Sequence, residues 1–169
     1  LVAYRHVTRQ RHDANAALVE GRQQLKNRSY TQAVDTLTRG LGHTQNLPGG
    51  RDLENELTSE LDLAKRGQAV DHLHALVDRL RFIYGATTLP VGEGNTLANR
   101  WRAVWDKRAW LKERSADLER DVEQRLDADL LDLGIIGADL CVRKAPPERA
   151  DQAFREALQI LAETEVLFG

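Results

Sequence analysis

Apolar residues recur every three or four positions through most of this 169-residue sequence, which is the spacing of one face of a helix. Glycine and proline cluster at three breaks, residues 47–50, 89–94 and 146–147. The segments between these breaks do not alternate apolar and polar residues as a half-buried strand would. The pattern therefore predicts an all-α fold.

The breaks divide the sequence into about six expected helices, arranged as an irregular antiparallel bundle. Their approximate ranges are 2–26, 29–41, 52–84, 96–118, 122–144 and 147–168, with an irregular segment at 86–95. Ser29 and Asp52 are residue types that cap helices, and Pro147 suits a first helical turn. The fifth helix contains LLDLGIIGADLCV, apolar on nearly every side, so we expect it to be central and buried.

Length and composition are those of a globular domain. The hydrophobic fraction is 41% and the charged fraction 30%, so we expect residues 1–169 to form one domain. The formal net charge of −2 gives no general attraction to nucleic acid or acidic membranes. No apolar run approaches the roughly 18 residues of a membrane span. The sequence has no methionine, so we expect it to be part of a longer chain.

Gly21 stands inside the first expected helix, where glycine costs about 1 kcal/mol relative to alanine. A close helix crossing would offset that cost. Ala33 and Gly40 in the next helix are also small, and Tyr30 can fill the space near the turn. The sequence therefore predicts that these two helices form a tight antiparallel hairpin.

The spacing of this hairpin resembles the tetratricopeptide repeat. The family has a small residue and then an aromatic one, which here are Gly21 and Tyr30. An alanine, a large apolar residue and a second small residue follow, which here are Ala33, Leu37 and Gly40. Glycine is usual in the family where Arg28 stands. A fainter copy lies 120 residues further on, so the resemblance implies hairpins in an irregular bundle and not a regular superhelix.

Four longer blocks look like the helical region beyond the kinase domain of large multidomain bacterial serine/threonine kinases. They are SYTQAVDTLTRGL, DHLHALVDRLRFIYG, DLLDLGIIGADLCV and APPERADQAFREALQILAETEVLFG. The resemblance implies a non-catalytic, cytoplasmic protein-interaction module attached to such a kinase. The alternative is a ligand- or peptide-sensing regulatory domain, which could lie on the periplasmic side of a membrane-anchored kinase.

The sequence carries no recognisable catalytic, cofactor or metal motif. The kinase signatures, a Gly-rich phosphate loop, His-Arg-Asp and Asp-Phe-Gly, are absent. The five histidines lack the four-residue spacing of a helical zinc site.

Cys141 lies in an apolar helix and is expected to pack as a small hydrophobe. Asp132 and Asp139 share a helical face and could do acid–base work, but we expect Asp139 to pair with Arg143. We therefore predict that this piece is not an enzyme, with no cofactor and no metal.

Two sets of residues are candidates for binding a partner. In tetratricopeptide hairpins the first helix lines the concave side, and the matching positions here are Asn15, Arg22 and Lys26. Residues 1–50 contain 7 Lys and Arg against 3 Asp and Glu, a net charge of +4, whereas residues 121–169 contain 5 against 11, a net of −6. An acidic or phosphorylated peptide is therefore the expected ligand, unless these residues are simply solvated.

The second candidate is the stretch NRWRAVWDKRAWLKER, which includes Arg100 and Arg108. Basic residues interleaved with aromatics can bind single-stranded nucleic acid. On a helix, however, Trp101 and Trp105 are expected to face the core while the basic residues face solvent. We therefore predict a protein-binding patch, since Arg and Trp are favoured at interfaces, and no nucleic-acid partner.

Overall fold

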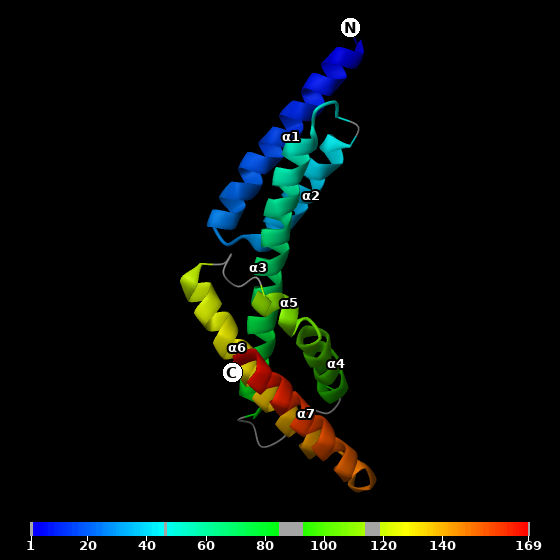
Figure 1. Cartoon of the computed structure of the whole chain (residues 1–169), viewed down its shortest axis with the longest axis vertical. Helices are drawn as coiled ribbons and strands as arrows, with labels where there is room; N and C mark the ends of the chain where they lie inside the picture. The colour runs from blue at the N-terminus through cyan, green and yellow to red at the C-terminus, as the bar shows by residue number, and fades with distance from the viewer. Residues whose placement is uncertain (1, 46, 85–92, 114–118, 169) are drawn as a thin grey trace. The chain divides into compact units, whose positions relative to one another are not determined.

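The computed structural model describes residues 2–45, 47–84, 93–113 and 119–168 (Figure 1). Over these residues it is 91% helical and has no strand, which confirms the all-α prediction. The seven helices of the described ranges are α1 (Val2–Lys26), α2 (Tyr30–Thr44), α3 (Arg51–Tyr84), α4 (Glu93–Trp105), α5 (Arg108–Glu113), α6 (Arg120–Lys144) and α7 (Ala150–Phe168). A short 3₁₀ turn, Pro147–Arg149, precedes α7.

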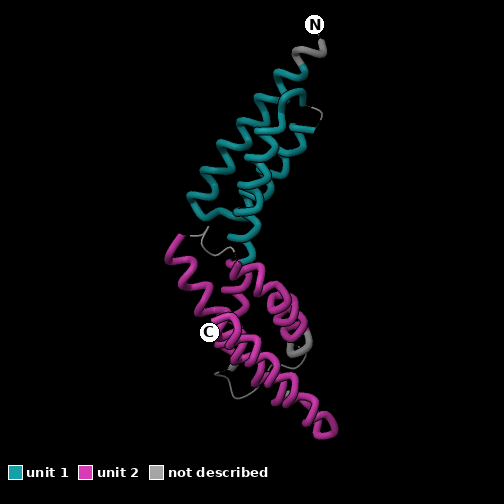
Figure 2. The backbone as a smooth tube through the Cα atoms, viewed as in Figure 1, with its two compact units in different colours: residues 1–69 teal, residues 70–169 magenta. Residues whose placement is uncertain are grey.

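The chain divides into two compact units, residues 1–69 and 70–169, and the division falls within α3 (Figure 2). Unit 1 contains α1, α2 and the first part of α3. Unit 2 contains the rest of α3 and α4 to α7. The expectation of one domain over residues 1–169 stays a prediction.

Unit 1 is held together by close contacts between small and branched residues. Its core includes Ala14, Ala33, Leu37, Leu57 and Ala64, all of them fully buried. A Cβ atom added at Gly21 would lie 2.5 Å from Cδ2 of Leu37, and one at Gly40 would lie 2.8 Å from Cβ of Ala17. The close approach predicted at Gly21 is therefore confirmed, and α1 and α2 form the expected hairpin.

The turn between α1 and α2 requires one left-handed residue. Arg28 has φ of 57°, its N–H donates to the carbonyl of Leu25, and the N–H of Ser29 donates to the carbonyl of Gln24. This pair of bonds is a Schellman motif, in which the left-handed position is usually glycine. Ser29 precedes α2 as expected, but its hydroxyl makes no capping hydrogen bond.

The start of α2 also contacts α3. The ring of Tyr30 occupies the space that a side chain at Gly67 would need. Beside it, Nε2 of Gln68 donates a hydrogen bond of 3.2 Å to Oγ1 of Thr31. Gly67 thus admits a close neighbour without interrupting the helix.

Unit 2 is built on α6, whose Leu126, Leu130 and Leu133 are fully buried. Trp101 and Trp105 of α4 are also buried, as predicted, and their rings stack with centroids 5.8 Å apart. The indole rings sit against Gly137 and Gly134 of α6, and Nε1 of Trp101 donates to the carbonyl of Leu133 at 2.8 Å. The two glycines therefore create the seats for the two tryptophans.

Two expectations about unit 2 need correction. The single helix expected over 96–118 is divided: α4 ends at Trp105 and α5 begins at Arg108, whose Nη1 donates to the carbonyl of Trp105 at 2.9 Å. This break lets Leu111 turn into the core, and residues 114–118 lie outside the described ranges. The fifth expected helix, now α6, is also not buried on all sides, because Leu131 and Ile135 are exposed.

Candidate functional site

A hollow of about 330 Å³ in unit 2 lies between α4, α6 and α7. Trp101 and Trp105 line it from α4, Cys141 from α6, and Gln159 and Glu163 from α7. Its lining therefore combines aromatic edges with charged and amide groups, the mixture typical of binding sites.

Glu163 is the most constrained polar group of this hollow. Its Oε2 accepts hydrogen bonds from Nε1 of Trp105 at 2.9 Å and pairs with Nη2 of Arg108 at 2.8 Å, while Oε1 accepts from Gln159 at 3.0 Å. Burial by itself would raise the pKa of Glu163. The hydrogen bonds from Trp105 and Gln159 and the charge of Arg108 outweigh burial, so the pKa is lowered overall.

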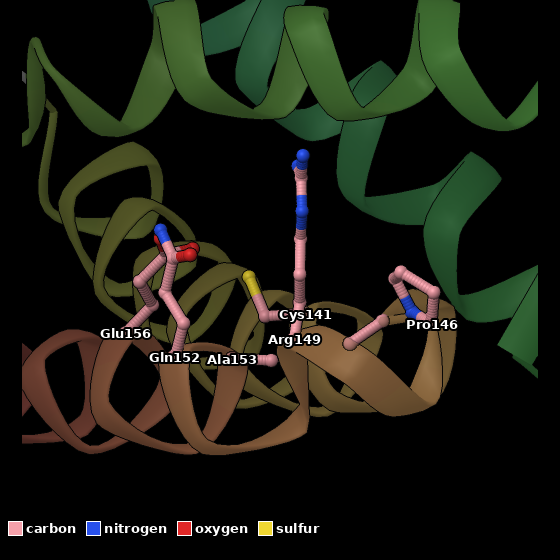
Figure 3. A pocket seen from close by; sticks show the side chains of 7 residues that line it. Cys141, Pro146, Arg149, Gln152, Ala153 and Glu156 are labelled. Atoms are coloured by element: carbon pink, nitrogen blue, oxygen red, sulfur yellow. The ribbon is translucent and has the colours of Figure 1, made fainter.

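A smaller hollow of about 190 Å³ continues along α6 and α7 (Figure 3). It is lined by Pro146 and Arg149 of the connection and by Gln152 of α7, and it shares Cys141 and Glu156 with the larger hollow. In Figure 3 the sulfur of Cys141 and the side chain of Arg149 both extend away from the α7 ribbon. We refer to the two adjoining hollows together as the α4–α7 groove.

Besides Arg108, two further guanidinium groups line this groove. Arg102 belongs to the larger hollow and Arg149 to the smaller, and within the described part of the chain neither side chain makes a hydrogen bond or an ion pair. Arg108, by contrast, already pairs with Glu163 and lies 4.8 Å from the centre of the Trp105 ring. Arginine forms bidentate hydrogen bonds to carboxylate and phosphate groups, so Arg102 and Arg149 could bind an anion.

The sequence-predicted residues of α1 lie on one exposed face but are not equally available. Nε of Arg22 pairs with Oε1 of Glu60 at 2.7 Å, and its Nη2 pairs with Oε2 of Glu56 at 2.9 Å. The hydrogen bond to Glu60, followed by that to Glu56, raises the pKa of Arg22. Asn15 donates to the carbonyl of Arg11, while Lys26 is exposed. The positive charge of Arg22 is therefore already balanced by two carboxylates within unit 1.

The two candidate residues from the tryptophan-rich stretch, Arg100 and Arg108, do not lie in the same site. Arg100 is exposed and does not line the groove, whereas Arg108 is half-buried within it. The tryptophan rings between them are buried, so Trp101 and Trp105 offer no open face on which a base could stack. The sequence singled out the helix that lines the groove, but its spacing alone did not distinguish Arg102, and it did not single out Arg149 on the connection to α7.

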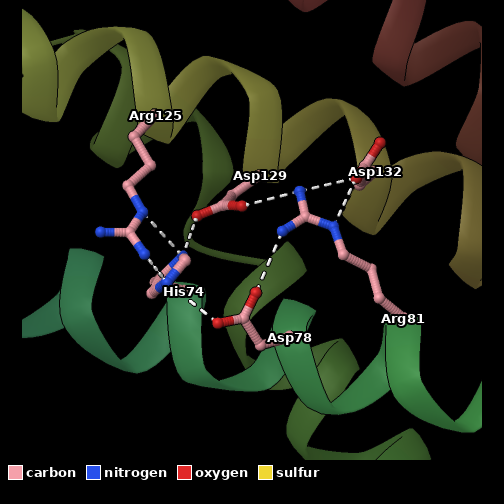
Figure 4. A network of polar contacts seen from close by, with 6 residues as sticks. All are labelled: His74, Asp78, Arg81, Arg125, Asp129 and Asp132. Carbon is pink, nitrogen blue, oxygen red and sulfur yellow. Dashed lines mark hydrogen bonds and ion pairs between the residues drawn. The ribbon is translucent and has the colours of Figure 1, made fainter.

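A second polar cluster in unit 2 joins α3 to α6 (Figure 4). Asp129, which is 1% exposed, accepts hydrogen bonds from Nδ1 of His74 at 2.8 Å and from Nη2 of Arg81 at 3.0 Å. Arg81 also pairs with Asp132, and that hydrogen bond is the main reason why its pKa is raised. Arg125 contacts the His74 ring. These mutual contacts favour a structural role, because the buried carboxylate is satisfied by its neighbours.

One further expectation can be compared with this geometry. Nε of Arg143 lies 2.6 Å from Oδ2 of Asp139, which confirms the expected ion pair. In the described ranges, no cluster of three or more His, Cys, Asp or Glu residues could hold a metal ion.

Comparison with protein-family models, with curated proteins and with solved structures returned no match. None of the described helices combines the length and the apolar character that crossing a membrane requires. By its structure the chain is all-α, and its second unit has an open groove in which the side chains of Arg102 and Arg149 make no hydrogen bond or ion pair with any described residue.

Proposed function

We propose that this chain is a non-catalytic protein-interaction module that binds an acidic or phosphorylated segment of a partner protein in the α4–α7 groove. The observation that carries the proposal is a pair of guanidinium groups, Arg102 and Arg149, that lie at two adjoining hollows and make no hydrogen bond or ion pair with any described residue. Charge-assisted hydrogen bonds from arginine are about twice as strong as neutral ones, so two such groups would favour a segment with two anionic side chains.

The size of the hollows supports a peptide ligand. Their volumes, about 330 and 190 Å³, are each at or below the lower end of small-molecule pockets. Successive side chains of an extended peptide could enter the two hollows in turn. Cys141 and Gln152 would lie between or beside them and supply small and hydrogen-bonding contacts.

The proposed setting is a larger signalling protein. The sequence resembles the helical region that follows the kinase domain in bacterial serine/threonine kinases, so the module would hold a partner or substrate close to a kinase on the same natural chain. The covalent step would belong to the kinase, and this piece would raise the local concentration of its target.

The test uses fluorescein-labelled peptides and fluorescence anisotropy. One peptide carries two phosphoserines in an acidic sequence, and the control peptide has serine and glutamine in their place. We expect the 169-residue chain to bind the phosphorylated peptide, and the double variant Arg102→Glu/Arg149→Glu to weaken that binding at least tenfold. Rising salt should weaken the wild-type interaction, because the contacts are between charges.

Two matched variants make the result specific. Arg100→Glu changes a neighbouring arginine on the same helix that lies outside the groove, and it should bind nearly as well as wild type. The double variant Arg22→Glu/Lys26→Glu tests the α1 face predicted from the sequence. If this second double variant loses binding while the groove variant retains it, the ligand site is on α1 and the groove proposal is wrong.

A further inference from the structure

The α6–α7 hairpin has a second apolar surface, separate from the α4–α7 groove. It consists of large apolar side chains that are 41–66% exposed: Leu131 and Ile135 of α6, and Phe154, Leu158 and Leu161 of α7. We call these five residues the outer face. A helix on the surface of a globular protein normally has one apolar stripe, which faces the core. A second, exposed apolar stripe is typical of a surface that binds another molecule.

The side chains of α7 point in three directions around the helix axis. Ala153, Ala157 and Ile160 are buried, and Thr164 lies against Gly134 of α6. At about 100° per residue, the groove residues Gln159 and Glu163 lie roughly a quarter-turn to one side of this buried line. Phe154, Leu158 and Leu161 lie roughly a quarter-turn to the other side.

The same division applies to α6. Gly134 and Gly137 face the tryptophans of α4, and Cys141 lines the groove. Leu131 and Ile135 lie on the flank of α6 that points away from α4. Because α6 and α7 are antiparallel, with Gly134 beside Thr164, Ile135 comes next to Leu161 in this register. The five side chains therefore form one continuous surface on the side of the hairpin opposite α4.

The charges on α7 fit a second copy of the same surface. Glu165 is the one charged residue within the apolar stripe, and its carboxylate makes no hydrogen bond or ion pair with any described residue. Arg155 is exposed, and among the described residues its side chain makes one hydrogen bond, donated by Nε to the carbonyl of Asp151 at 3.2 Å. If two α7 helices cross antiparallel with Leu158 of one opposite Leu161 of the other, Glu165 comes beside Arg155 of the second copy.

We infer that the outer face binds a second copy of this chain about a twofold axis. The twofold arrangement repeats each contact: Leu158 meets Leu161 twice, and Arg155 meets Glu165 twice. Leu131 and Ile135 extend the buried apolar area on either side of the helix pair. Since the α4–α7 groove lies on the opposite side of α7, the dimer would leave both grooves open and would carry two copies of whatever the groove holds.

Sedimentation velocity and sedimentation equilibrium on the 169-residue chain test the inference, with circular dichroism to verify folding. Wild type should sediment as a dimer at tens of micromolar. Leu158→Asp places a charge at the centre of the outer face and should weaken dimerisation at least a hundredfold without changing the helical signal. The matched control is Val166→Asp, which changes an 84% exposed apolar residue on the same helix but off the stripe. This control should remain dimeric.

A charge exchange tests the proposed pairing of residues. Arg155→Glu and Glu165→Arg should each weaken the dimer about tenfold, because each single variant places like charges side by side. The double variant Arg155→Glu/Glu165→Arg restores opposite charges and should recover most of the affinity. A wild-type chain that is monomeric at every concentration tested, or a dimer that Leu158→Asp leaves intact, would overturn the inference. A double variant no stronger than the singles would overturn the antiparallel register.

Discussion

The side chain of Leu37 in α2 occupies the space in which a side chain at Gly21 of α1 would begin. A Cβ atom at Gly21 would lie 2.5 Å from Cδ2 and 2.6 Å from Cγ of Leu37, and Leu37 is itself fully buried. Neither residue can therefore move aside without disturbing the core of unit 1. This contact explains why a helix retains glycine in its interior despite the lower helix propensity.

Gly21→Ala should destabilise the chain even though alanine is the better helix former. The added methyl group would overpack the crossing, which costs about 1–3 kcal/mol in a well-packed core. The control is Gly42→Ala, because a Cβ at this helical glycine would meet no atom within 4 Å. That variant should be more stable by up to about 1 kcal/mol. Urea unfolding followed by circular dichroism measures both, and equal effects would argue against the close crossing.

Arg28 provides a test of backbone strain at the end of α1. Its φ of 57° is costly for any residue with a Cβ, by about 1 kcal/mol. Arg28→Ala removes the arginine side chain but keeps the Cβ atom and therefore the backbone strain. Arg28→Gly removes both the side chain and the strain. We therefore expect the glycine variant to melt at a higher temperature than the alanine variant. Equal melting temperatures would mean that the turn relaxes and stores no strain.

The α1–α2 hairpin could be predicted because a helix crossing needs small residues at fixed spacings, and Gly21 and Ala33 meet that need in the sequence itself. The sequence also indicated that Trp101 and Trp105 face inward, because they are one helical turn apart. The break between α4 and α5 could not be predicted in this way. No glycine or proline marks it in the sequence, and the hydrogen bond from Arg108 to the carbonyl of Trp105 that spans it forms only in the folded chain.

The groove and the outer face were harder to predict for a related reason. Arg149 becomes part of a site only through the register of α6 against α7, which is a long-range property. Similarly, an apolar stretch such as residues 130–142 predicts burial, but it does not reveal which side the chain itself covers. Leu131 and Ile135 are apolar in the sequence and exposed in the structure. That difference is one of the observations on which the proposed dimer rests.

Asp129 should be the most sensitive polar residue of unit 2. Asp129→Ala would remove a buried carboxylate that accepts hydrogen bonds from His74 and Arg81, leaving both donors unsatisfied on that side. Because these donors are partly exposed and can recover some solvation, we expect a loss of about 2–3 kcal/mol. Asp132→Ala should cost less than about 1 kcal/mol, since Asp132 is half-exposed. Denaturant unfolding of the two variants checks the order, and the reverse order would contradict a structural role for the cluster.

Glu163 predicts a specific dependence of stability on pH. Its pKa in the folded chain is lowered from the usual value of 4.5, so its ionised form is favoured by folding. The stabilisation is therefore fully present above pH 4.5 and is lost as pH falls through the lower, folded-state pKa. Glu163→Gln removes the titrating group, so wild type should be more stable than this variant near neutral pH and the difference should shrink at acidic pH.

The measurement is the free energy of unfolding of wild type and Glu163→Gln from pH 7 down to pH 3. Glu148→Gln is the matched control, because Glu148 is exposed and makes no ion pair with any described residue. Its difference from wild type should stay small and constant over the same range. The amide of the glutamine variant can still accept the hydrogen bond from Trp105, so the changing part of the difference reports the charge facing Arg108. A Glu163→Gln difference that does not change with pH would show that the carboxylate charge contributes nothing to the stability of unit 2.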